Sequence, residues 1–144
     1  MRLWHKDLIS YLPRQQLIAQ WRELCAICSN LASKGTPNHL LVNKILDYPK
    51  NHFWTYYSLI VKEMSDRGYR ITANSMDKFS SNYYLFAHSY LDDYKVIKVI
   101  DVYPDWHNER YLKQCLYNLQ EKYDCGGISE EEWRIITDNF GGVK

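Results

Sequence analysis

The chain has 144 residues, of which 46% are hydrophobic and 24% are charged, enough for one domain with its own core but too few for two. Its first residues carry several charges and no long apolar run follows them, which excludes a secretory signal and a membrane span and favours a cytoplasmic protein. The four cysteines are unevenly spaced, so we expect free thiols and not a disulfide framework.

Charge is unevenly divided along the chain, although the net charge is only +1. Residues 1–62 hold eight Lys or Arg against three Asp or Glu, a net charge of +5, and the remainder holds ten against fourteen, a net charge of −4. Such asymmetry can turn a basic face toward a polyanion, or it can reflect solvated charges with no common purpose. Charge alone therefore gives a weak indication of nucleic-acid binding.

The apolar residues of the N-terminal half predict three helices. The first begins near Pro13, whose missing N–H costs nothing in a first turn, and its apolar face advances by three and four residues: Leu17, Trp21, Leu24, Cys28 and Leu31. A second helix is expected to begin at Thr36 and to stop before Pro49. The third is predicted by Phe53, Tyr57, Ile60 and Met64, with Gly68 ending it.

The C-terminal half is less regular. Between Tyr69 and Asp101 we expect an irregular stretch with a short helix, because the apolar spacing follows no clean period. A further helix is predicted by Leu112, Cys115, Leu116, Leu119 and Tyr123, with Asp105 as its cap. The last helix opens at Ser129, three residues before Glu132, and runs to Phe140. The predicted fold is all-α, a single compact helical domain over residues 1–144 with irregular connections.

Arg22 and Glu23 lie on opposite shoulders of the first predicted helix. At 100° per residue, Glu23 falls about 120° from Leu17, beside Gln16 and Gln20, and Arg22 falls about 140° away on the other side. A carboxylate at the margin of a core would lose hydration, which raises its pKa and suits acid–base chemistry. The alternative is an ordinary solvent-facing pair, since exposed helices are rich in Glu and Arg.

The N-terminal sequence resembles a known protein family, and this resemblance indicates a function that the spacing of residues alone does not. The runs "LISYL" and "WREL", followed by "NHLLVNKIL" and "RGYRI", resemble the phage-type pyrimidine-dimer DNA glycosylases over about residues 1–71. The resemblance implies an all-α enzyme that acts on damaged double-stranded DNA without a cofactor. Such an enzyme excises a damaged pyrimidine and then nicks the strand through an imine formed by its own α-amine.

The resemblance also assigns roles to residues of this chain. It implies Met1 and Glu23 as catalytic residues, and Arg2, Arg22 and Gln16 as DNA-binding residues. We expect Met1 to be retained because the residue after it is bulky. An α-amine has a pKa of about 7.7 to 8.0, so a useful fraction is neutral and nucleophilic at physiological pH.

An alternative function follows from positions that differ from the family pattern. Arg2 replaces the usual small second residue, Gln16 replaces a histidine, and Ala26 replaces a basic residue. Gln16 can donate a hydrogen bond to phosphate but carries no charge, and Ala26 can do neither. The alternative is a catalytically inactive helical module that binds nucleic acid or another protein. The sequence indicates neither the lesion nor the oligomeric state.

Other candidate sites receive less support from the sequence. Cys25 and Cys28 have the spacing of metal ligands, but no second pair accompanies them, so core thiols are favoured. His39 and Asn43 would lie one helical turn apart and could face a ligand, or they could be structural. The five histidines show no spacing typical of a metal site. We therefore predict no metal.

Overall fold

The regular structure of the chain is helical throughout the residues that the computed structural model describes, 1–88 and 90–141. The α-helices there are α1 (Arg14–Lys34), α2 (Lys50–Asp66), α3 (Ala73–Ala87), α4 (Glu109–Asp124) and α5 (Glu130–Phe140). Short 3-10 helices connect them: η1 (Lys6–Tyr11), η2 (Asn43–Asp47), η3 (Leu91–Tyr94) and η4 (Val99–Asp101). The all-α prediction is confirmed.

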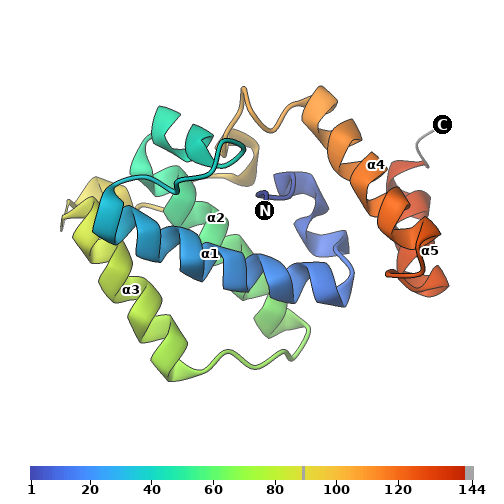
Figure 1. Cartoon of the computed structure of the whole chain (residues 1–144), viewed down its shortest axis with the longest axis horizontal. Coiled ribbons are helices and arrows are strands. Elements are labelled where there is room, and N and C mark those ends of the chain that lie inside the picture. The colour runs from blue at the N-terminus through green and yellow to red at the C-terminus, as the bar shows by residue number, and fades with distance from the viewer. Residues whose placement is uncertain (89, 142–144) are drawn as a thin grey trace.

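Helix α1 crosses the middle of the molecule and contacts both α2 and α3. Helices α4 and α5 contact each other at the end of the molecule away from α3 (Figure 1). Aromatic side chains fill the junction of the first three helices. The rings of Tyr57 and Phe79 stack with centroids 4.0 Å apart, and Trp21 lies 5.8 Å from Phe79. Large buried rings of this kind contribute most of the apolar area of a core, so this junction holds α1 rigidly against the other two helices.

Four of the predicted helices are present, and the end signals predicted at Pro13, Gly68 and Ser129 are confirmed. Pro13 immediately precedes α1, and Gly35 ends it in the left-handed conformation with φ of 71°. Gly68 follows α2 with φ of 78°, a value that glycine adopts without steric cost. The Ser129 hydroxyl and the Glu132 carboxylate form the predicted capping box at the start of α5. The sequence signals for helix ends are therefore reliable in these places.

The helix predicted from Thr36 to Pro49 is wrong. Only the short η2 forms there, because side chains satisfy the backbone groups that a helix would use. His39 Nδ1 accepts a hydrogen bond from the Leu41 backbone N–H at 3.3 Å, the Asn30 side chain donates to the Pro37 carbonyl oxygen at 3.3 Å, and Asn38 adopts a left-handed φ of 57°. Local bonds of this kind compete with helix formation. The segment consequently forms a turn between α1 and α2.

The stretch from Tyr69 to Asp101 is more ordered than predicted, because it contains the 15-residue helix α3. The Thr72 hydroxyl caps this helix by accepting the Ser75 N–H. Between α3 and Asp101 the described residues are irregular as expected, apart from η3 and η4. The predicted cap at Asp105 is also wrong, because the Asn108 side chain caps α4 instead.

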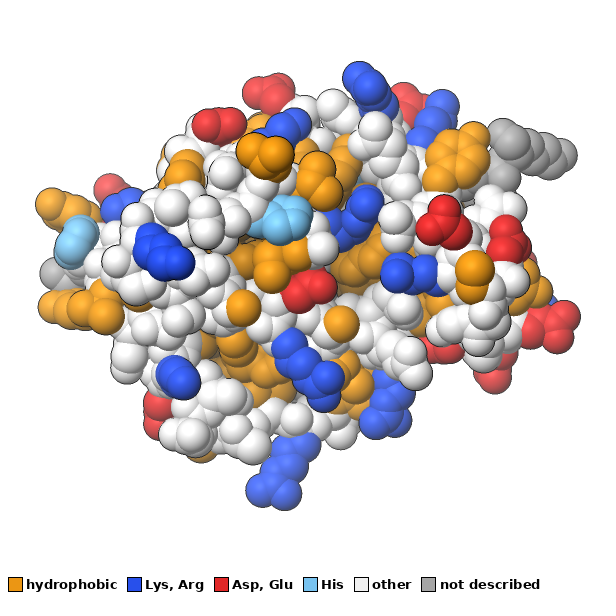
Figure 2. All heavy atoms as spheres, viewed as in Figure 1, with side chains coloured by type: hydrophobic (Ala, Val, Ile, Leu, Met, Phe, Trp, Pro, Cys, Tyr) orange, Lys and Arg blue, Asp and Glu red, His pale blue; other side chains and the backbone are white. Residues whose placement is uncertain are grey.

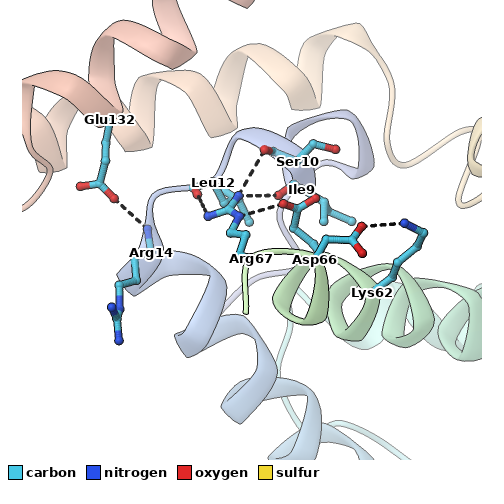
Figure 3. Close-up of polar contacts among 9 residues, drawn as sticks. Ile9, Ser10, Leu12, Arg14, Lys62, Asp66, Arg67 and Glu132 are labelled. Atoms are coloured by element: carbon cyan, nitrogen blue, oxygen red, sulfur yellow. Dashed lines mark hydrogen bonds and ion pairs between the residues drawn. The ribbon is translucent and has the colours of Figure 1, made fainter. Parts of the chain in front are cut away.

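The end of α2 is fastened to the N-terminal segment by one arginine (Figure 3). Arg67 donates hydrogen bonds to the carbonyl oxygens of Leu12, Ser10 and Ile9 at 2.7, 3.2 and 3.4 Å. Its Nε also donates to the Glu63 carboxylate at 2.8 Å. A guanidinium offers five donors in a rigid fork, so this single side chain fixes the path of the chain just before α1.

Candidate active site

A buried amide on α1 holds the first residues of the chain. Gln20 is fully buried, and its Oε1 accepts a hydrogen bond from the Trp4 N–H at 2.8 Å. Its Nε2 donates to the Arg2 carbonyl oxygen at 2.9 Å and to Glu23 Oε2 at 3.2 Å. One side chain therefore connects the N-terminal backbone to the Glu23 carboxylate.

Two tyrosines from other helices complete the attachment. The Tyr56 hydroxyl, on α2, lies 2.6 Å from the Trp4 carbonyl oxygen and 3.0 Å from Gln20 Oε1. The Tyr111 hydroxyl, on α4, donates to the Leu3 carbonyl oxygen at 2.6 Å. Side chains from α1, α2 and α4 thus bind the consecutive carbonyls of residues 2–4, which positions the chain end.

Glu23 lies partly buried among positive charges. Burial raises the pKa of its carboxyl, because removal of water disfavours the charged form. The Met1 α-amine opposes this rise most strongly, followed by a hydrogen bond from the Arg2 backbone N–H and the charges of Lys122 and Arg2. The structure therefore brings Met1, Arg2 and Glu23 together. Met1 itself is 47% exposed.

Arg22 belongs to a different surface. Its exposed side chain lines an open groove of about 730 Å³ on the other shoulder of α1. Three further arginines line that groove, Arg14, Arg67 and Arg70, and none of the described residues lining it is acidic. The Arg14 guanidinium lies 5.0 Å from the Tyr69 ring centroid, which holds it over the groove. Such a surface suits a chain of phosphates.

Gln16 lies on the same flank of α1 as Glu23 and is half-buried. Its Oε1 is buried, with no hydrogen-bond partner among the residues described. Ala26 is exposed on the surface of α1.

A pocket of about 330 Å³ adjoins the N-terminal segment. Its lining comes from the chain end, the turn after α1 and the region around α4: Arg2, Leu40, Leu41, Lys44, Trp106, Tyr111 and Gln114. Arg2 belongs both to this pocket and to the surroundings of Glu23. Arg2 therefore connects the pocket to the surroundings of Glu23.

The remaining candidates of the sequence have structural roles. All four cysteines are free, and burial raises the pKa of Cys28 to about 12. His39 Nδ1 accepts the Leu41 N–H within the turn that Asn43 stabilises. Over residues 1–88 and 90–141, no three His, Cys, Asp or Glu side chains are placed to hold a metal ion. In the same residues, no helix has the length and apolar character needed to cross a membrane.

The sequence did not indicate a functional role for several residues of the site. Gln20 could be placed on the Glu23 flank of the helix, but its bonds to the N-terminal backbone depend on the fold. Tyr56, Tyr111 and Lys122 come from α2 and α4, and no local pattern links them to Glu23.

Comparison with known proteins assigns the family. A family model described as pyrimidine dimer DNA glycosylase matches residues 1–77, which is more than half of the chain. Neither the curated proteins nor the solved structures include a match to this chain. The matched region contains Met1, Gln20, Glu23 and Tyr56, the core of the arrangement described above. The chain belongs to the pyrimidine dimer DNA glycosylase family.

Proposed function

We propose that this protein excises damaged pyrimidines from duplex DNA and then cleaves the strand at the resulting abasic site. The observation that carries the proposal is the Met1 α-amine beside the partly buried Glu23 carboxylate. A nucleophile next to a base is the arrangement that covalent catalysis requires. Family membership supports a DNA substrate, and the lyase step rests on the chemistry of the amine.

The first step joins the enzyme to the sugar. The neutral Met1 amine attacks C1′ of the damaged nucleotide, and the bond from C1′ to the base breaks as the base leaves with the bonding electrons. The amine then loses a proton and the ring oxygen gains one, so that the sugar ring opens and an imine remains. In this proposal Glu23 accepts the amine proton and passes it to the ring oxygen; its raised pKa supports the role, because a desolvated carboxylate is a stronger base than a solvated one.

The second step cleaves the strand. Loss of the C2′ proton to a base lets the electrons move toward the imine, and the 3′ phosphate leaves with its bonding pair. Water then hydrolyses the imine and restores the Met1 amine. The negative charge of Glu23 stabilises the cationic imine for the lifetime of that intermediate. The hydrogen bonds of Gln20 to Arg2 and Glu23 keep the carboxylate close to the chain end.

The surface charge suits a duplex that crosses α1. Figure 2 shows Lys and Arg side chains spread over the face around α1, whereas acidic side chains gather at the end near α5. We place the reacting sugar at Met1 and Glu23, with Arg2 and Gln16 toward the adjacent phosphates. Arg22 and the groove it lines face the phosphates on the far side of α1.

Borohydride trapping of the imine tests the proposal directly. Wild-type protein is incubated with a duplex that contains either an abasic site or a pyrimidine dimer, and the adduct is counted after reduction. Acetylation of the Met1 amine should abolish the adduct, and Glu23→Gln should lower the rate by about 10²- to 10⁴-fold. The matched control is Glu131→Gln, on the exposed surface of α5, which should trap like wild type.

The inactive binding module is the competing outcome of the same experiment. Three features favour it: Arg2 in place of a small second residue, and Gln16 and Ala26, which supply no positive charge. Binding to the damaged duplex without any adduct on either substrate would establish that alternative and overturn the enzymatic proposal.

A further inference from the structure

Two adjacent leucines project from the turn between α1 and α2. Leu40 is 89% exposed and Leu41 is 57% exposed. The turn that carries them is fixed, because Asn43 Oδ1 accepts the His39 N–H and His39 Nδ1 accepts the Leu41 N–H. The buried Val42 follows directly and anchors the turn in the core. The leucines are therefore held outward on a rigid support.

The two leucines lie beside the candidate catalytic residues. They line the same pocket as Arg2, whose backbone bonds to Gln20 and to Glu23. Arg2, the residue next to Met1, is the link between this pocket and the site, and we route the strand whose sugar reaches the Met1 amine along the pocket and past this turn. An apolar projection at that place contacts whatever flanks the reacting nucleotide.

The charge around the leucines favours a nucleic acid over a protein as the occupant. From Leu24 to Leu46 the sequence contains no acidic residue, whereas it contains Lys34 and Lys44. Lys44 lines the pocket together with the leucines and Arg2. Apolar tips flanked by cations match the chemistry of DNA, in which apolar base faces lie between phosphate backbones.

We propose that Leu40 and Leu41 act as a wedge that enters the base stack of duplex DNA next to the reacting nucleotide. The proposal rests on the proposed function, because it takes DNA as the ligand. An amine can approach C1′ only when the nucleotide is displaced from its stacked position, and apolar side chains inserted between base steps favour that displacement. Single-stranded DNA has no continuous stack to open, so the wedge should matter there far less.

The experiment compares duplex and single-stranded substrates for a Leu40→Ala/Leu41→Ala variant. Both side chains are exposed, so the fold should be retained, and thermal unfolding checks this. Imine trapping on a duplex with a pyrimidine dimer, whose bases are stacked, should slow by about tenfold or more, whereas trapping on the same single strand should be unchanged. Leu85→Ala is the matched control, since Leu85 is also 57% exposed but lies on α3. This control should behave as wild type.

A second measurement separates the wedge from the chemistry. A fluorescent base analogue, 2-aminopurine, placed next to the abasic site brightens when it is unstacked, and the signal requires binding but no reaction. Wild-type protein should brighten it and the double variant should not, even at saturating protein. Equal brightening by both proteins, no brightening by wild type, or equal loss of trapping on both substrates would each overturn the wedge. Absence of any adduct with wild type would instead overturn the proposed function, while the fluorescence still tests the wedge.

Discussion

The Gln20 side-chain nitrogen lies 3.2 Å from the Glu23 carboxylate and 2.9 Å from the Arg2 carbonyl oxygen. The oxygen of the same buried amide accepts a hydrogen bond from the Trp4 N–H. The position of the chain end relative to the carboxylate is therefore set by the helix and does not depend on an unrestrained terminus. Termini are ordinarily poorly ordered unless they are tied down in this way.

Replacement of Gln20 by methionine should impair the reaction more than the fold. Methionine fills a similar volume but leaves the Trp4 N–H and the Arg2 carbonyl without their partner, at a cost of about 1–3 kcal/mol for each unsatisfied group. Urea unfolding measures that loss. At a temperature where the variant is fully folded, imine trapping should still be slower, because the amine is no longer held beside Glu23.

The control for this prediction is Gln15→Met, an exposed position on the same helix. It should change neither the free energy of unfolding nor the trapping rate. A Gln20→Met protein that is less stable but traps at the wild-type rate would show that Gln20 is structural only.

The Glu23→Gln substitution should stabilise the fold increasingly as pH rises. Because the pKa of Glu23 is raised in the folded state, the wild type is most favoured at low pH and loses stability as this carboxyl ionises. Glutamine does not titrate. The difference in unfolding free energy, variant minus wild type, should therefore grow between about pH 4 and pH 7.

Urea unfolding at several pH values measures this difference, with Glu131→Gln as the exposed control. A difference that shrinks toward neutral pH would mean that the positive charge of Met1 outweighs desolvation at Glu23, contrary to the raised pKa.

The sequence predicted those helices whose apolar spacing and end signals agree. For α5, a capping box and a following glycine accompany the pattern, and the prediction was right. Leu41, Ile45 and Tyr48 have helical spacing too, but the His39 side chain accepts the Leu41 backbone N–H, which a helix begun at Thr36 would need for its bond to Pro37. Spacing reports where side chains could face and not whether the backbone has a better local partner.

The length of helix α3 was underestimated for the opposite reason, since only a short helix was predicted in that stretch. Its buried residues, Phe79, Tyr83 and Ala87, recur every four positions, but exposed neighbours such as Tyr84 and Leu85 are equally apolar and conceal the period. The site residues likewise divide into those that the sequence indicated and those that only the fold brings together. The resemblance indicated Met1 and Glu23, whereas Lys122 approaches from α4 and could be identified only in the folded chain.

The arginine groove should account for part of the salt dependence of DNA binding. Arg70 and Arg14 are exposed and line it, whereas Arg67 bonds to backbone carbonyls and is unsuitable for a test. Arg70→Ala should weaken duplex binding, because one fewer phosphate is neutralised. The slope of log affinity against log salt should then fall in magnitude by about 0.9. Fluorescence anisotropy over a salt series measures both quantities.

An exposed arginine on α5, Arg134, provides the control for the groove. Arg134→Ala should leave affinity and slope unchanged. If Arg70→Ala and Arg134→Ala reduced the slope equally, net charge alone would explain binding and the groove would have no specific role.

His107 should make the fold sensitive to acid. Its ring is almost fully buried, its Nδ1 accepts the Lys6 N–H at 2.9 Å, and its Nε2 has no partner among the described residues. Burial, reinforced by the charges of His5 and Lys6, lowers the pKa of His107 to about 2. The neutral ring is thus the form that fits the core, and protonation would place an unpaired charge there.

The sign of this effect defines the experiment. A histidine with an unfolded pKa of about 6.5 and a much lower folded pKa stabilises the fold fully above pH 6.5. That stability is lost as pH falls toward the folded pKa, at up to about 1.4 kcal/mol for each pH unit. Asparagine can still accept the Lys6 N–H through Oδ1 but cannot titrate, so His107→Asn should have a flatter dependence of unfolding free energy on pH.

The His107→Asn variant should also be less stable than wild type at pH 7.5, because asparagine has no ring to pack against Trp106 and Tyr111. The informative quantity is therefore the slope between about pH 6 and pH 4, obtained from urea unfolding. His88→Asn serves as the control, since His88 is exposed and has a φ of 59°, a left-handed conformation that asparagine tolerates. This control should keep the wild-type slope. If His107→Asn also kept the wild-type slope, other groups would govern the loss of stability in acid, with His5 and His52 the next to test because burial lowers the pKa of both.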